Sequence, residues 1–436
     1  MFFREIMKKT ILTTSSIAIL ASLTFAGEFD NSNYYGSTRD GSNVDGNIIN
    51  DLSEGDLNYY YGGTVNTVKP GQACGSVNGN IYNNLYGVTI KNYVGANWAN
   101  DSSGNPSVMG GVSGTIFNNI SNSTVKGKFY AGNLSSGPNA NWTVETIGSI
   151  ETNITNNSYV QEVCVSGGAI VNRVIGNASV NIVDSTVAEI FHNGGTYIGG
   201  DCNIKLTNSN VVGNYFYGSG STNLSSSYDW ANPRGINGNL NIILEGSTKV
   251  NNDIFATDGD VNGSVNITIT DTAIVGGTIY GGNGNAKEKV LNIGGEKSFK
   301  GSALKADSFD SVNISSDSIV DISLANISKL SIENGAKVSL ASESEFEKLL
   351  IRFDDEIFTL DDTVDISEIF GDSASVVLSE IESGSSFTIL DANQNLFTVG
   401  LAGGTLSITS EIPEPSTYAA IIGAIALAFA AYRRRK

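Results

Sequence analysis

The segment VNGSVNITITDTAIVGGTIYGG, from Val261 to Gly282, decides the fold of this chain. Val265, Ile267 and Ile269 are spaced by two, so they lie on one face of a strand and the polar residues between them on the other. Two further short apolar runs follow, each after a turn of small or polar residues. Three short strands joined by tight turns describe one coil of a parallel β-solenoid, whose apolar face is buried only when the next coil stacks on it.

Degenerate copies of this unit run from about Val44 to Leu340. Clear examples are GNASVNIVDSTVAEIFHNGG (Gly176–Gly195), GDCNIKLTNSNVVGNYFYGSG (Gly200–Gly220) and GNLNIILEGSTKVNNDIFATDG (Gly238–Gly259). The Asn of the Asn-Ile pair, or of its close variant, recurs at Asn153, Asn181, Asn203, Asn241, Asn266, Asn292 and Asn313. Asn recurring at equivalent turns predicts a stacked ladder of amides. Antiparallel hairpins in a sandwich use the same residue types, but the repetition favours the solenoid.

The fold class expected is therefore all-β: a right-handed parallel β-helix over residues 27–340, interrupted by irregular insertions. The composition agrees, because 50 of the 436 residues are Gly, only 6 are Pro and only 16% are charged. The net charge of −19 argues against nucleic acid as a partner. Three cysteines, Cys74, Cys164 and Cys202, allow one internal bridge at most, so this is not a disulfide scaffold.

The first 26 residues have the pattern of a secretory signal. Basic Lys8 and Lys9 precede the apolar run Ile11–Leu23, and small residues precede a predicted cut between Ala26 and Gly27. This pattern predicts export through the Sec translocon. The alternative is an uncleaved membrane anchor.

Three insertions rich in Asn and Ser resemble one another: residues 96–106, 133–143 and 223–233. Together they hold all three tryptophans of the chain, Trp98, Trp142 and Trp230. Insertions at one position of a coil project from one side of a solenoid, where exposed aromatic rings could stack on sugars. The alternative, which we favour, is that each Trp folds back and seals its own loop.

Residues 341–410 change character. Between 341 and 391 there are 14 acidic residues against Lys348 and Arg352, with Phe, Ile and Leu interspersed. The apolar content predicts a folded segment and not an acidic tail. We interpret 341–410 as the cap that a solenoid needs at the end of its last coil.

The tail, residues 411–436, has three parts in order: Pro413-Glu414-Pro415, the uncharged run Tyr418–Tyr432, and Arg433-Arg434-Arg435-Lys436. The run of 15 residues is short for a transmembrane helix, with Tyr418 and Tyr432 placed to anchor it at the two interfaces. The terminal cations predict an internal C-terminus.

This arrangement closely resembles the PEP-CTERM sorting signal of Gram-negative, exopolysaccharide-producing bacteria. The resemblance implies transient anchoring in the inner membrane, cleavage near the Pro-Glu-Pro motif by an exosortase-type protease, and delivery to the cell surface or extracellular matrix. An ordinary single-span tail anchor is the alternative. The repeats also resemble autotransporter passenger domains, a likeness of composition only.

Catalytic motifs are weak. The single histidine, His192, lies in a predicted turn, and Asp258, Asp260 and Asn262 match only the first half of a calcium loop. We therefore expect no metal, no cofactor and no enzymatic activity. The function expected is that of an exported surface or matrix protein. The alternatives are a carbohydrate-binding adhesin that uses the Trp loops, with exopolysaccharide as its partner, and a polysaccharide-degrading β-helix enzyme.

Overall fold

The protein is all-β in the part of the chain that the computed structural model describes. That part is residues 24–412, apart from positions 26, 31, 38, 66–73, 101–109, 137–143, 169–171, 192–196, 220–234, 334–335, 342–343, 345, 354–355, 361–375, 379–385, 391–395 and 403–404. The chain falls into two compact units: unit 1 is Met1–Asn241 with Thr257–Gly263, and unit 2 is Ile242–Ala256 with Ser264–Lys436.

The strands of unit 1 are short, with two long exceptions. They are β1 (Thr24–Phe25), β2 (Glu28–Asp30), β3 (Asn33–Tyr35), β4 (Asn47–Tyr61), β5 (Ile81–Val94), β6 (Trp98–Asn100), β7 (Ile116–Ser121), β8 (Thr124–Tyr130), β9 (Leu134–Ser136), β10 (Val144–Thr146), β11 (Ile150–Thr155), β12 (Tyr159–Cys164), β13 (Asn172–Val174), β14 (Ala178–Val183), β15 (Thr186–Phe191), β16 (Tyr197–Ile198), β17 (Cys202–Thr207), β18 (Asn210–Val211), β19 (Tyr217–Ser219) and β20 (Gly235–Ile236).

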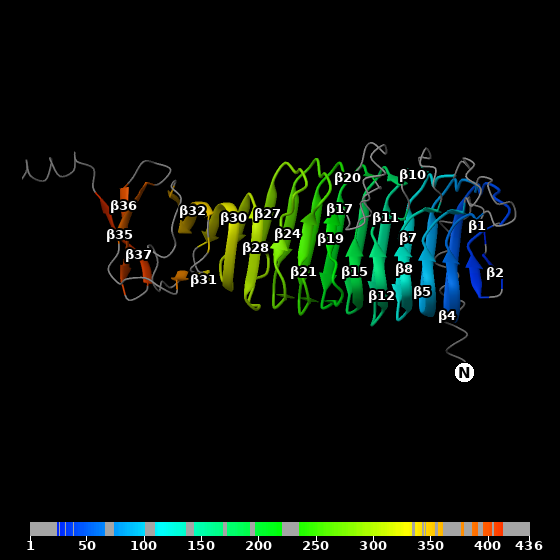
Figure 1. The fold of residues 1–436 in the computed structure, drawn as a ribbon, viewed down its shortest axis with the longest axis horizontal. Coiled ribbons are helices and arrows are strands. Elements are labelled where there is room, and N and C mark those ends of the chain that lie inside the picture. Colours follow the sequence, from blue (N-terminus) through cyan, green and yellow to red (C-terminus); the bar gives the residue numbers. More distant parts are fainter. Residues whose placement is uncertain are drawn as a thin grey trace, which may run out of the picture. The chain divides into compact units, whose positions relative to one another are not determined.

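Successive coils of unit 1 stack in parallel on three sides. The first side pairs β5, β7, β11, β14 and β17, and the second pairs β4, β5, β8, β12 and β15, which lie side by side in Figure 1. The third is the sheet β10-β13-β16-β20. Aliphatic residues in register build the core: Ile48, Ile81, Ile116 and Ile150 form one fully buried column. The predicted parallel repeat is therefore confirmed.

A corner of four residues separates the first side from the second. It reads Asn122-Ser-Thr-Val, Asn157-Ser-Tyr-Val, Asp184-Ser-Thr-Val and Asn208-Ser-Asn-Val on successive coils. Each leading residue has a positive φ, between 48° and 60°, a conformation that Asn and Asp tolerate better than most residues. The second, third and fourth Ser hydroxyls each accept a hydrogen bond from the Ser N–H of the preceding coil, at 3.1 to 3.2 Å, and the Ser123 hydroxyl accepts one from the Val88 N–H at 3.1 Å. The corner thus ties every coil to the next.

The interior of unit 1 contains a stack of aromatic rings. Tyr34, Tyr60, Tyr93 and Phe129 lie nearly parallel on successive coils, with centroids 5.2, 4.8 and 4.3 Å apart. Tyr60, Tyr93 and Phe129 are fully buried. Burial raises the pKa of Tyr60 and of Tyr93 well above the ordinary value, because a buried phenolate loses its hydration.

A ladder of buried amides runs beside this stack. Asn50 Nδ2 donates to Asn83 Oδ1 (2.8 Å), and Asn83 Nδ2 donates to Asn118 Oδ1 (2.9 Å). Asn83 Nδ2 also donates to the Gly95 carbonyl (2.8 Å), and Asn83 Oδ1 also accepts from the Tyr60 hydroxyl (2.7 Å). All four hydrogen-bonding positions of this amide are used, which is what its complete burial requires.

From Leu240 onward most strands are again short, and β30 is the long exception. They are β21 (Leu240–Glu245), β22 (Lys249–Val250), β23 (Ile254–Thr257), β24 (Val265–Ile269), β25 (Ile274–Val275), β26 (Ile279–Tyr280), β27 (Lys289–Ile293), β28 (Leu304–Phe309), β29 (Ser311–Ile314), β30 (Ile319–Glu333), β31 (Lys337–Leu340), β32 (Phe346–Phe353), β33 (Glu356–Leu360), β34 (Val376–Leu378), β35 (Ser386–Leu390), β36 (Leu396–Ala402) and β37 (Thr405–Ile412).

In unit 2, the three strands expected within Val261–Gly282 are present as β24, β25 and β26. Val265, Ile267 and Ile269 are fully buried, as their alternation predicts. Parallel pairing continues from β24 to β27 and β29, and from β26 to β28 and β30. The same stacking rule therefore operates in both units.

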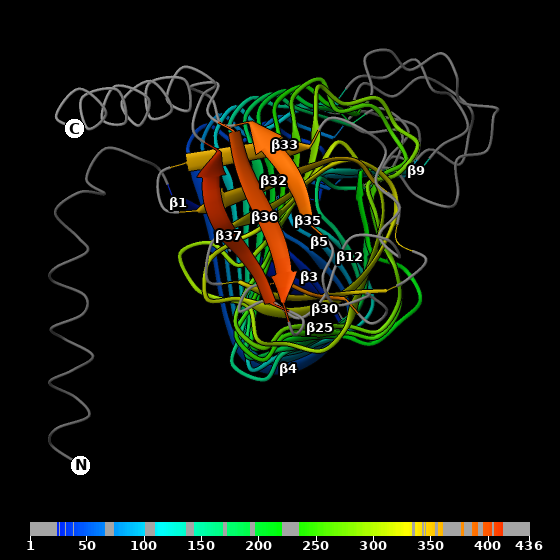
Figure 2. The ribbon, with the colours of Figure 1, turned by 90° about the vertical axis from the view of Figure 1, so that its left-hand side faces the viewer.

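The pairing becomes mixed after β32. β30 pairs with β32 and β31 pairs with β34 in parallel, but β32–β33, β35–β36 and β36–β37 are antiparallel. Figure 2 shows β35, β36 and β37 with alternating directions. The proposed cap begins at 341, and the first antiparallel pair of unit 2 is formed by β32 and β33, joined between Phe353 and Glu356.

The expected stacking of asparagines is present between Asn153 and Asn181, Asn203 and Asn241, and Asn292 and Asn313, but these residues do not form one continuous ladder. Asn153 pairs with Asn181, but Asn203 pairs with Ser179, two residues earlier on that strand. These residues also lie in strands and not at turns. The amides instead form several short ladders, because the Asn-Ile pair stands at a different position within each strand: it follows Val180 in β14 but Cys202 in β17.

Candidate functional site

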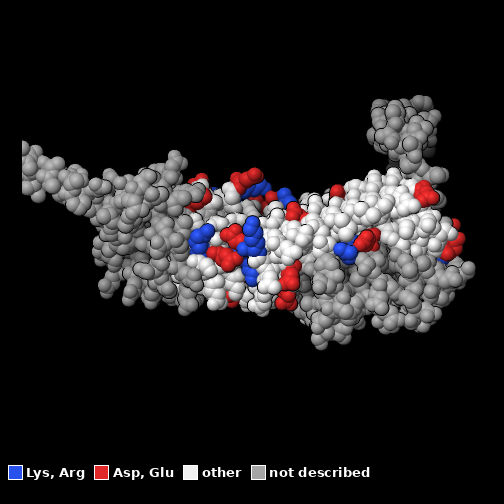
Figure 3. Space-filling view, turned by 90° about the horizontal axis from the view of Figure 1, so that it is seen from above, with Lys and Arg blue, Asp and Glu red and all other residues white. Residues whose placement is uncertain are grey.

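The outward face of the first side is polar and weakly charged. Its ladder begins at Asp51 and continues as Asn84, Asn119, Asn153 and Asn181, with side-chain hydrogen bonds of 2.7 to 3.4 Å from each coil to the next. Figure 3 views the protein from another direction, and there too residues other than Lys, Arg, Asp and Glu cover most of the described surface. Isolated clusters of charge therefore stand out.

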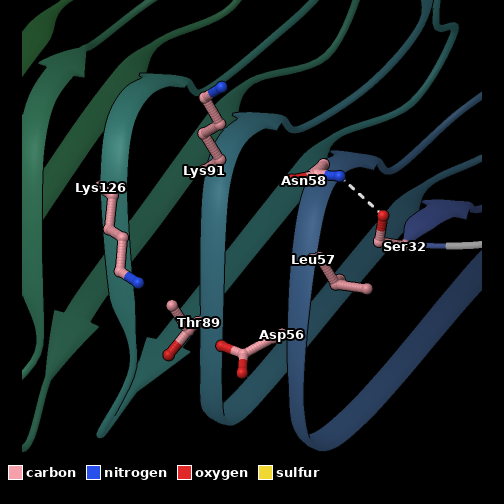
Figure 4. Close-up of a pocket in the computed structure, with 7 residues that line it drawn as sticks. All are labelled: Ser32, Asp56, Leu57, Asn58, Thr89, Lys91 and Lys126. Atoms are coloured by element: carbon pink, nitrogen blue, oxygen red, sulfur yellow. Dashed lines mark hydrogen bonds between the residues drawn. The ribbon is translucent and has the colours of Figure 1, made fainter.

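One such cluster lines an open groove on the second side of unit 1. The groove has a volume of about 630 Å³ and is lined by Ser32, Asp56, Leu57, Asn58, Thr89, Lys91 and Lys126, shown in Figure 4. These residues come from β4, β5 and β8 and from the turn before β3. We call this surface the lysine groove.

A β-bulge places the lysines of the groove. Between the paired positions Ile90↔Val125 and Tyr93↔Phe129, strand β5 has two residues and β8 has three. The extra residue lets Lys126 and Lys128, on either side of Gly127, both point outward. Lys128 pairs with Glu162 (3.7 Å), whereas Lys91 and Lys126 form no ion pair within the described part of the chain.

Two carboxylates lie directly after these lysines. Glu162 and Glu189 are paired residues on β12 and β15, so their side chains project from neighbouring rungs. Burial raises the pKa of Glu189, and the neighbouring charge of Glu162 raises it further. Lys128 stabilises Glu162 from the other side. Charge along this strip therefore changes from positive to negative over a few coils.

Trp98 is the one tryptophan that the described residues include. Its ring stacks on Tyr61, with centroids 5.0 Å apart and planes 22° apart. It packs with Leu134 against the buried cluster of Tyr35, Tyr61, Val65 and Val94. One face of the indole is therefore occupied by the protein itself. Trp142 and Trp230 lie outside the described residues, as does His192.

The three cysteines are buried thiols. Burial raises the pKa of Cys74 to about 11 and that of Cys202 to about 12, so both are protonated at neutral pH. Among the described residues, no group of three or more His, Cys, Asp or Glu could hold a metal ion. Asp258, Asp260 and Asn262 belong to the coil-to-coil turn around Val261, whose N–H groups bond to the preceding coil.

The predicted processing sites lie at or beyond the two ends of the part of the chain that the structure describes. Gly27 is described and Ala26 is not, and β1, just before the predicted cut, pairs in parallel with Asn47 and Ile48. A cut before Gly27 would remove this strand. The tail residues Pro413, Glu414, Pro415, Tyr418, Tyr432, Arg433, Arg434, Arg435 and Lys436 lie outside the described residues. In the ranges that are described, no helix is long and apolar enough to cross a membrane.

Comparison with known proteins places the chain in no family. No protein-family model, no curated protein and no solved structure matches it significantly.

The lysine groove was not predicted from the sequence. Its strongest local signal is Lys126-Gly127-Lys128, two lysines around a glycine in a chain with few cations, which is compatible with a bulge. No local sequence pattern predicts that Asp56, Asn58 and Ser32 also line the groove. Their position there depends on which coils are neighbours in the stack.

Proposed function

We propose that this is an exported, non-enzymatic protein of the cell surface or extracellular matrix, with a right-handed β-helix as its body. The observation that carries the proposal is the order of Pro413-Glu414-Pro415, the apolar run Tyr418–Tyr432 and four terminal cations, together with a secretory signal at the other end of the chain. This order is that of the PEP-CTERM signal, whose processing needs an exosortase-type protease.

The contacts between the coils of unit 1 support a role as a stable structural domain. Ser corners, buried Asn amides and stacked rings each connect one coil to the next. Such contacts stabilise a stack of coils without a disulfide, which suits a chain whose thiols are buried. The outward faces offer small polar side chains in ladders, a surface suited to contact with hydrated polymers and not to the convergence of catalytic groups.

The proposal includes a transient intermediate in the inner membrane. The Sec translocon exports the chain, the apolar run holds the C-terminus in the membrane, and the basic tail stays inside. Cleavage near Glu414 then frees residues up to the motif. Intact mass of the protein recovered from the surface or matrix tests this: the expected mature form starts at Gly27 and ends near Pro413–Pro415. A recovered form that still ends at Lys436 would overturn processing.

Replacing the motif provides the matched experiment. Glu414→Ala with both prolines changed to Ala should keep the chain in the membrane fraction, because the protease no longer recognises it. Changing Ser416 to Ala, next to the motif, should leave sorting intact. Equal release of the two variants would mean that the tail is an ordinary anchor or is cut elsewhere.

A further inference from the structure

Three charged side chains of the lysine groove have no partner in the described protein. Asp56, Lys91 and Lys126 line the same hollow, yet none of them forms an ion pair or hydrogen bond with a described residue. In Figure 4, Lys126 extends toward the Thr89 end of the groove and Lys91 toward the opposite end. The charges are therefore available to a ligand.

Placing Lys91 and Lys126 on neighbouring strands also costs stability. They lie on neighbouring rungs of a parallel sheet, about 4.8 Å apart in backbone spacing. Like charges on adjacent strands destabilise a sheet, and no carboxylate of the described chain forms an ion pair with either lysine. Elsewhere on the same strip Lys128 does have such a carboxylate, Glu162. The unpaired arrangement is what an anion-binding surface needs.

The remaining side chains of the groove are suited to hydroxyl groups. Asn58 Nδ2 donates to the Ser32 hydroxyl (2.6 Å), which holds both at one end of the groove. Asp56 accepts hydrogen bonds only, Thr89 both donates and accepts, and Asn58 keeps its Oδ1 for an acceptor role. The buried side chain of Leu57 forms an apolar patch between these polar groups. Anion-binding lysines beside hydroxyl-binding groups are the combination that a carboxylated sugar requires.

We infer that the lysine groove binds an acidic polysaccharide, with Lys91 and Lys126 holding carboxylate groups and Asp56, Asn58 and Thr89 binding ring hydroxyls. A nucleic acid fits poorly, because Asp56 lies in the groove and the chain carries a net charge of −19. The open groove crosses successive coils, so it accommodates a polymer and not only a single sugar. The inference deepens the proposed function and rests on it, because it takes the extracellular ligand to be a glycan.

The test uses the purified full chain with polygalacturonate as the probe and neutral dextran as its counterpart. We expect binding to polygalacturonate, weakening as salt is raised, and none to dextran. The double variant K91Q/K126Q should bind at least about tenfold more weakly, because it loses two charge-assisted contacts. The control K249Q/K305Q removes two exposed strand lysines of unit 2 and the same total charge, and it should bind as the unmodified protein does.

The variant Asp56→Asn distinguishes specific binding of sugar hydroxyls from non-specific electrostatic attraction of a polyanion by the lysines. If the groove binds sugar hydroxyls through Asp56, this variant binds more weakly. If the lysines merely attract polyanions, removing the carboxylate strengthens binding and the inference is wrong. Equal losses in the two lysine double variants, or no binding by the unmodified protein, would also overturn it. Unchanged thermal unfolding shows that each variant is folded, and the mass of the mature form tests sorting independently.

Discussion

The Tyr93 hydroxyl donates a 2.6 Å hydrogen bond to Oδ1 of Asn118, which lies on the following coil. Tyr60 makes the same contact with Asn83 at 2.7 Å. One rung further, the aromatic position is Phe129, without a hydroxyl, and the ladder position is Thr152, without an amide; Thr152 accepts the last Nδ2 hydrogen bond at 3.1 Å. The stack and the ladder therefore end together, which indicates that each supports the burial of the other.

Removing one amide should break this arrangement. Asn83→Ala removes the buried side-chain partner of the Tyr60 hydroxyl and of the Gly95 carbonyl, and it removes one of the two hydrogen bonds that Asn50 Nδ2 donates. We expect a loss of about 3 kcal/mol or more in the free energy of unfolding, measured by urea denaturation. Asn119→Ala, in the outer ladder, is the matched control and should cost less than about 1 kcal/mol. Similar losses in both variants would contradict the importance of the inner ladder.

The stacked tyrosines predict sensitivity to alkali. Burial raises the pKa of Tyr34 to about 12 from an ordinary 10.0, and it raises the pKa of Tyr60 and of Tyr93 well above 10.0. The unfolded chain therefore loses phenolic protons first, so stability is complete below about pH 10 and falls as the pH rises toward the folded-state values. Urea midpoints from pH 7 to pH 11.5 should be constant and then decline. A midpoint that stays constant throughout would show that these phenols titrate normally.

The neighbouring carboxylates of Glu162 and Glu189 predict a substitution that stabilises the protein. Glu189 has a raised pKa because of burial and of Glu162 beside it, so the penalty for its charge is present at neutral pH and disappears as the pH falls below its ordinary range. Glu189→Gln should raise the urea midpoint slightly at pH 7 and leave it unchanged near pH 3. A lower midpoint at pH 7 would mean that the carboxylate makes a stabilising contact that outweighs the repulsion.

Trp98 tests whether its insertion serves packing or recognition. Trp98→Ala removes the stack on Tyr61 and the contact with Leu134, and we expect a loss of roughly 1–3 kcal/mol in stability. Binding to polygalacturonate should not change, because the lysine groove is intact. Unchanged stability combined with lost polysaccharide binding would instead identify Trp98 as a sugar contact.

Much of the fold follows from local patterns in the sequence. The alternation of Val265, Ile267 and Ile269 is enough to define a half-buried strand, because side chains alternate across a strand whatever it pairs with. The turns within Val261–Gly282 follow in the same way from their small and polar residues. Repetition of that unit then predicts parallel stacking, because a single coil cannot bury its own apolar face.

The sequence by itself therefore determined the kind of strand, the repeated coil and the polar character of the outward faces. Only the tertiary structure decided which residues stack. Equivalent turn residues of successive coils, such as Asn47 and Asn80 or Asp201 and Asn239, are separated by between 24 and 38 residues. Because the insertions vary in length, register is set by packing between coils and not by spacing along the chain. Lys91, Lys126 and Asp56 come together in one groove for this reason.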